Sequence, residues 1–143
     1  MRHQNLPKAG IIAGLLLCPW FACAADPAPP MEVVEPLISK ALAGAPDQEL
    51  LMLTVQYLPG RASLPHRHDA QVFVYVLEGE VLMQVEGSPA VTLHAGQTFY
   101  EGPADVHVVS ANASKTKSAK ILVFMVKDKS APATRGVASG TAK

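Results

Sequence analysis

The sequence predicts an all-β fold in which two sheets pack on each other or one sheet closes on itself. Apolar runs of strand length recur along the chain and are rich in Val, Ile, Leu and aromatic residues. Residues typical of turns separate these runs at short intervals. No segment is periodic and long enough to form helices that would cover a sheet, so the strands must bury the core among themselves.

The expected strands follow one another at the spacing of antiparallel β-structure. The first, at 32–38, comes after a proline-rich leader. Only residues 39–45 could hold a helical turn, which Gly44 and Pro46 would end. The further apolar runs lie at 49–58, 72–77, 81–85, 90–93, 98–100, 106–109 and 120–126. The turns between them lie at 59–60, 78–80, 86–89, 95–96 and 102–105.

Two of these runs indicate how the strands are buried. Residues 81–85 alternate, with Val81 and Met83 on one face and Gln84 on the other, as expected of a strand with one buried face. The run "VFVYVL" at 72–77 is apolar on both faces, so its outer face needs cover from the strand at 32–38 or from a second subunit. We therefore expect a homodimer.

The first 24 residues are predicted to be a signal peptide. They have a basic start, the apolar centre "IIAGLLL" and small residues at Ala22 and Ala24 that fit a cleavage site. A membrane anchor is the alternative, but the apolar run is short for a span. A form anchored to lipid through Cys23 is a further, less favoured alternative. We expect an exported protein, periplasmic or secreted.

The remaining chain is expected to hold one domain. Residues 25–47 form a proline-rich leader and an N-terminal strand, 48–128 the β-barrel, and 129–143 a disordered tail without apolar periodicity.

Composition excludes several classes of function. Cys18 and Cys23 are the only cysteines, so after cleavage the domain has no disulfide, cysteine nucleophile or thiolate ligand. Loss of Arg2 and Lys8 leaves ten basic and twelve acidic residues. This balance indicates neither nucleic acid nor an anionic membrane as partner, which favours a small-molecule ligand or substrate.

Two histidines one residue apart suggest a metal site. In an extended strand His66 and His68 point to the same side, and Arg67 points away. Two nitrogens do not complete a site, so a third ligand must come from elsewhere. His94 and His107 are the candidates, and His94 lies next to a turn, as a solvent-edge histidine would.

The spacing of these histidines resembles the two conserved motifs of the cupins over residues 48–128. Gly60, His66, His68 and Gly79 match the first motif, and Gly96 and His107 match the second. The resemblance implies a small jelly-roll double-sheet barrel, often dimeric, with one divalent transition metal in its mouth. It selects His107 as the third metal ligand and implies Fe²⁺ first, with Mn²⁺, Ni²⁺, Zn²⁺ or Cu²⁺ as alternatives.

The chain departs from the cupin pattern at the carboxylate ligand, because Val72 stands where the family has glutamate. Gly102 and Ala104 replace the proline and glycine of the second motif, and its asparagine position falls at Ala111, one place before Asn112. The remaining set resembles that of three-histidine iron cupins, which cleave carbon–carbon bonds of diketones or act on thiols with dioxygen. Glu101 is the preferred candidate for a fourth ligand, and Gln71 is the alternative.

Two function hypotheses follow. The first is a metal-dependent dioxygenase that acts on a small chelating oxyanion, with Tyr100 and Glu101 as candidate catalytic residues. The second is a non-catalytic cupin module that binds a small ligand or a metal.

Overall fold

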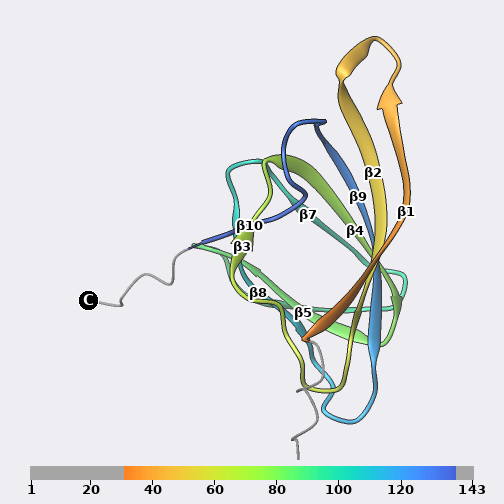
Figure 1. Cartoon of the computed structure of the whole chain (residues 1–143). Coiled ribbons are helices and arrows are strands. Elements are labelled where there is room, and N and C mark those ends of the chain that lie inside the picture. Colours follow the sequence, from red (N-terminus) through yellow and green to blue (C-terminus); the bar gives the residue numbers. More distant parts are fainter. Residues whose placement is uncertain (1–30, 138–143) are drawn as a thin grey trace, which may run out of the picture.

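The computed structural model describes residues 31–137, which form ten strands in two antiparallel sheets (Figure 1). The strands are β1 (Glu32–Leu42), β2 (Ala45–Tyr57), β3 (His66–Arg67), β4 (Ala70–Glu78), β5 (Glu80–Val85), β6 (Val91–His94), β7 (Thr98–Glu101), β8 (Val106–Asn112), β9 (Ala119–Asp128) and β10 (Arg135–Gly136). The first sheet has the order β1-β2-β9-β4-β7 and the second the order β10-β3-β8-β5-β6. The predicted all-β, double-sheet fold is confirmed.

The core lies between the two sheets. In β4 every second residue from Ala70 to Val76 is buried, and in β9 the same holds from Ala119 to Lys127. In the second sheet Val81 and Met83 of β5 face these strands and are fully buried. The alternation predicted for 81–85 is therefore the inner face of a sheet.

The outer face of β4 is apolar, as the sequence predicts, and β1 does not cover it. Phe73 and Tyr75 are 45% and 42% exposed. β1 pairs edge to edge with β2, from Glu32 opposite Tyr57 onward, so it widens the first sheet within its own plane.

The N-terminal part of the domain differs from the sequence prediction. Residues 39–45 form no helical turn, because β1 continues to Leu42 and β2 starts at Ala45. Gly44 adopts a positive φ of 81° in the tight turn between them. The hairpin satisfies backbone groups along both strands, which outweighs the weak helical propensity. The barrel sheets therefore begin at Glu32, and the predicted boundary at residue 48 falls inside β2.

The predicted disordered tail from residue 129 is also corrected for the part that the structure describes. The chain turns back after β9, and β10 pairs with β3, placing Gly136 opposite His66. Nζ of Lys127 donates to the carbonyl of Ala131 over 2.6 Å, which fixes this return. Backbone partners order the segment although it lacks apolar periodicity.

The predicted signal peptide, its cleavage site, both cysteines and residues 138–143 lie outside the described residues. Within the described range there is no helix long and apolar enough to cross a membrane.

Candidate metal centre

Three histidines meet inside the barrel. His66 of β3 lies directly opposite His107 of β8, and His68 comes immediately after β3. One candidate ligand atom from each histidine lies within 4.8 Å of the others. His68 and His107 are buried. Arg67, which lies between His66 and His68 in the sequence, points away from them, and its side chain is 49% exposed. The structure thus brings together the three histidines that the sequence selects.

In His66 and His68, a hydrogen bond to the backbone determines which ring nitrogen is available to a metal. Nδ1 of His66 lies 2.7 Å from the carbonyl oxygen of Leu64, and Nδ1 of His68 lies 2.6 Å from that of Ala133. A carbonyl only accepts, so each Nδ1 carries the hydrogen and donates it. In the neutral form of each ring Nε2 then keeps its lone pair, which is the arrangement of metal-binding histidines.

Burial keeps His66 in the form that binds a metal. Loss of hydration lowers the pKa of His66, and the neighbouring imidazoles of His68 and His107 lower it further. The ring is therefore neutral near neutral pH.

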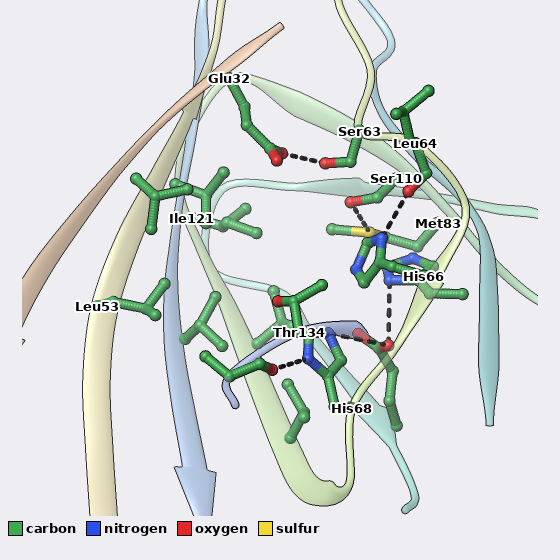
Figure 2. Close-up of a pocket in the computed structure, with 18 of the residues that line it drawn as sticks. Glu32, Leu53, Ser63, Leu64, His66, His68, Met83, Ser110, Ile121 and Thr134 are labelled. Carbon is green, nitrogen blue, oxygen red and sulfur yellow. Dashed lines mark hydrogen bonds and ion pairs between the residues drawn. The ribbon is translucent and has the colours of Figure 1, made fainter. Parts of the chain in front are cut away.

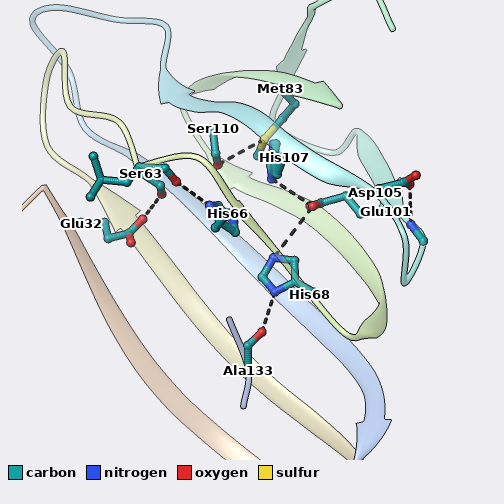
Figure 3. A network of polar contacts seen from close by, with 12 residues as sticks. Glu32, Ser63, His66, His68, Met83, Glu101, Asp105, His107, Ser110 and Ala133 are labelled. Carbon is teal, nitrogen blue, oxygen red and sulfur yellow. Dashed lines mark hydrogen bonds and ion pairs between the residues drawn. The ribbon is translucent and has the colours of Figure 1, made fainter. Parts of the chain in front are cut away.

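The third ring lies beside a buried carboxylate. Oε2 of Glu101 is 3.0 Å from Nδ1 of His107 and 3.9 Å from Nε2 of His68 (Figure 3). Glu101 and His107 are only 2% and 3% exposed.

These two residues also hold the unsatisfied polar atoms of the core. Among residues 31–137, Oε2 of Glu101 and Nε2 of His107 are the buried side-chain nitrogen and oxygen atoms that lack a hydrogen-bond partner. Both atoms are of types that bind metal cations, and neither is satisfied by a hydrogen-bond donor. The residues present therefore fit a divalent metal ion.

The register of the strands explains how Glu101 reaches the site. Val72 of β4, which occupies the family's glutamate position, lies directly opposite Glu101 of β7. Directly opposed residues in a sheet project to the same face. The carboxylate that β4 lacks is thus present on the adjacent strand.

Two other sequence candidates lie outside the site. Gln71 precedes Val72 and is exposed on the opposite face of β4, because successive residues of a strand alternate. Tyr100 is 51% exposed and packs its ring against Phe73 on the outer face, with 5.2 Å between the ring centroids. Since Tyr100 does not line the cavity, it is not placed to act as a catalytic residue there.

Two further residues from the sequence analysis have roles on the surface and in a loop. His94 is exposed and lies 3.3 Å from Glu80, as expected of a solvent-edge histidine. Asn112 is buried, and its amide donates to the backbone carbonyl of Lys117 over 2.7 Å.

A cavity of about 300 Å³ opens beside the histidines (Figure 2). Most of its wall is apolar and comes from the core strands, including Leu53, Val72, Val74, Met83, Ile121, Val123 and Met125. Five polar residues of the wall were not predicted from the sequence: Glu32, Tyr57, Ser63, Ser110 and Thr134. They lie in separate segments and form no sequence motif, so only the closed barrel shows that they meet.

Comparisons with solved structures agree with this fold. The DMSP lyase DddQ from Ruegeria pomeroyi DSS-3 is 21% identical with a TM-score of 0.62, and the match covers 78% of this chain and 54% of that one. Oxalate oxidase in complex with the substrate analogue glycolate is 25% identical with a TM-score of 0.58, over 75% of this chain and 55% of that one. The polyketide cyclase RemF from Streptomyces resistomycificus is 19% identical with a TM-score of 0.59, and the match covers 78% of this chain and 74% of that one.

The chain thus spans about half the length of the first two of these proteins. A search of curated protein sequences found no match. The family model described as "Cupin domain" matches residues 53–125, slightly more than half of the chain, and includes all three histidines and Glu101. The protein therefore belongs to the cupin family.

Proposed function

We propose that this cupin is a metal-dependent oxygenase that binds Fe²⁺ through His66, His68 and His107 and acts on a small chelating oxyanion. The observation that carries the proposal is the set of three converging histidine nitrogens and the unsatisfied Glu101 oxygen at the wall of an apolar cavity. Nδ1 of His66 and His68 are each occupied by a carbonyl oxygen, so their Nε2 atoms are oriented before any ion binds.

The charge of the site selects an anionic substrate. Three imidazoles and the single carboxylate of Glu101 offset only part of the charge of a divalent ion, so an anionic group on the substrate would complete the site. When bound, the metal would supply Lewis-acid polarisation of that group and a binding position for dioxygen.

Two features of the chain act on the substrate itself. Oε2 of Glu101, 3.9 Å from Nε2 of His68, is placed to accept a proton from a substrate group beside the ligand nitrogens. The apolar walls contributed by β2, β4 and β9 surround the rest of a small substrate and keep water from it.

One of the similar structures supports this substrate class. Oxalate oxidase, at 25% identity, is described with glycolate, a small oxyanion, as its substrate analogue. The other two proteins support the fold alone.

Metal analysis of matched histidine variants tests the site. We expect the parent protein to retain close to one divalent ion, and His66→Ala, His68→Ala and His107→Ala each to lose it. His94→Ala removes a surface histidine outside the cluster and serves as the matched control, with unchanged metal content. Retention of parental metal by His107→Ala would refute the ligand set.

Oxygen uptake tests the reaction separately. The Fe²⁺-loaded protein should consume dioxygen with at least one member of a panel of small 2-oxo and 2-hydroxy carboxylates and diketones. Metal binding together with no oxygen uptake across the panel would favour the non-catalytic binding module instead.

We also propose that the protein is exported, from the signal-like residues 1–24. Cleavage after Ala24 would remove both cysteines, so thiol labelling combined with intact mass should find no thiol in the mature chain. A labelled mature chain would show that Cys23 remains and that this cleavage site is wrong.

A further inference from the structure

The cavity contains a second polar cluster, which we call the Glu32 cluster and define as Glu32, Tyr57, Ser63 and Ser110. These residues come from β1, β2, the β2–β3 loop and β8, and all four line the cavity. Figure 3 shows Glu32 and Ser63 on one side of His66 and Glu101 on the other. The two carboxylates therefore lie on opposite sides of the His66 ring.

Hydrogen bonds connect the members of the Glu32 cluster. Oγ of Ser63 donates to Oε2 of Glu32. The hydroxyl of Tyr57 lies 3.1 Å from Oγ of Ser63 and 2.7 Å from Oγ of Ser110. A fourth contact, 3.5 Å long, joins Oγ of Ser110 to the sulfur of Met83.

The number of hydroxyl hydrogens sets the direction of the hydrogen bonds in the Glu32 cluster. Three hydroxyls supply three hydrogens for four contacts, so one contact has no hydrogen. The sulfur of Met83 is a weak acceptor, so its contact with Ser110 is the one that receives no hydrogen. The hydrogens then run from Ser110 to Tyr57, from Tyr57 to Ser63, and from Ser63 to Glu32. In this arrangement each hydroxyl hydrogen points along the series toward the carboxylate of Glu32.

The charge of Glu32 remains largely uncompensated. In the described part of the chain Glu32 takes part in no ion pair. A carboxylate can accept about four hydrogen bonds, and Ser63 supplies one. Burial raises the pKa of Tyr57 to about 12, so its hydroxyl stays protonated and cannot take a proton from a ligand as a base would at neutral pH.

We propose that the Glu32 cluster is a second subsite, which binds a protonated amine of the same ligand whose oxyanion meets the histidines. This rests on the proposed function, because it assumes an oxyanion at the histidine end. Apolar side chains such as Leu53, Val55 and Ile121 line the cavity as well and suit a short methylene chain. A cavity of about 300 Å³ is small for a ligand site, so the class of ligand is a short amino carboxylate.

Matched ligand pairs test the subsite with the full chain loaded with zinc. Zinc has no redox chemistry, so binding is measured by calorimetry without turnover. Each pair replaces an ammonium by a methyl group of similar size: 3-aminopropanoate and butanoate, 4-aminobutanoate and pentanoate, and 5-aminopentanoate and hexanoate. We expect the amine of at least one pair to bind about 10-fold more tightly, since it gains a charge-assisted hydrogen bond.

The Glu32→Gln variant should remove that preference and leave the affinity for the methyl partner unchanged. Its amide oxygen can still accept from Ser63, so the connection between β1 and the loop is kept. Glu35→Gln is the matched control on the same strand, because Glu35 is exposed and does not line the cavity. The preference of the parent protein is measured without substitution, so the test does not depend on how the variant folds.

Two outcomes would overturn the proposal. In the first, the carboxylates bind, but the protein binds no amine more tightly than its methyl partner, or the preference for the amine persists in Glu32→Gln. The Glu32 cluster then only connects β1 to the β2–β3 loop, and the proposed function stands. If zinc binds but neither azide nor any carboxylate binds to it, the oxyanion site of the proposed function fails as well.

Discussion

Glu101→Gln should change the stability of the metal-free protein and its metal affinity in opposite directions. In the metal-free protein the carboxylate is 2% exposed, and its Oε2 has no hydrogen-bond partner. The substitution replaces this buried carboxyl group by a neutral amide, so no charge can lie in the core without a hydrogen-bond donor there. We expect the free energy of unfolding to rise by about 1–2 kcal/mol, and the melting temperature to rise by about 4–8 °C per kcal/mol in a domain of this size.

The same substitution should weaken metal binding. Removing a group that supports or ligates a metal typically lowers affinity about 10- to 100-fold, which corresponds to about 1.4–2.7 kcal/mol. The stabilisation that saturating metal gives to the folded state should fall by the same amount. Loss of the carboxylate would also leave more of the ion's charge uncompensated, so azide should bind more tightly to the metal-loaded variant.

Melting curves with and without metal at pH 8 measure both effects in one experiment. Glu80→Gln is the control, because the Glu80 side chain is 51% exposed and pairs with His94 on the surface. If Glu101→Gln melts at a lower temperature without metal, the Glu101–His107 contact is a stabilising pair and our reasoning about an orphaned charge is wrong. If its metal affinity equals that of the parent, the three histidines hold the ion without help from Glu101.

Three further predictions concern pH, backbone conformation and assembly. Nζ of Lys127 lies 2.7 Å from Glu49, and this hydrogen bond lowers the pKa of Glu49. The folded pKa is therefore below the unfolded value of about 4.3, so the pair stabilises fully above that pH and less as pH falls through the folded pKa. Glu49→Gln should thus melt earlier at pH 7 but not near pH 2, and an equal deficit at both would contradict this. Gly79 and Gly87 both have positive φ, but a Cβ at Gly79 would lie 2.7 Å from a backbone oxygen while one at Gly87 meets nothing within 4 Å. Denaturant unfolding should show Gly87→Ala costing about 1–2 kcal/mol and Gly79→Ala about 1–3 kcal/mol more; equal costs would exclude the close contact. Phe73 is 45% exposed in the apolar outer face, so light scattering should find a dimer for the parent and a monomer for Phe73→Asp, whereas a monomeric parent would refute the expected homodimer.

Much of the fold could be predicted from local sequence patterns, because buried faces of strands repeat every second residue. The alternation at 81–85 and the apolar run at 72–77 both correspond to strands of the structure, β5 and β4. The prediction was wrong where partners distant in sequence decide the structure. A helical turn at 39–45 fits local propensity, but the pairing of β1 with β2 along their lengths outweighs it.

The candidate site divides in the same way. His66 and His68 are separated only by Arg67, so their common direction follows from strand geometry alone. The place of Glu101 depends on the register of β7 against β4, which sets it opposite Val72. The Glu32 cluster joins residues up to 78 positions apart, from Glu32 to Ser110, and their types are common on any strand or loop. Its chemistry is therefore visible only once the barrel is closed.

The return segment after β9 shows why composition underestimates some functional parts of a chain. Two of its contributions to the site come from backbone atoms: the carbonyl of Ala133 orients His68, and β10 pairs with the strand that carries His66. Backbone groups are the same in every residue apart from proline, so a segment that acts through them needs no apolar or polar pattern. A stretch of Ser, Ala, Pro, Thr and Gly can thus resemble a disordered tail in sequence and still fix the tautomer of a metal-site histidine.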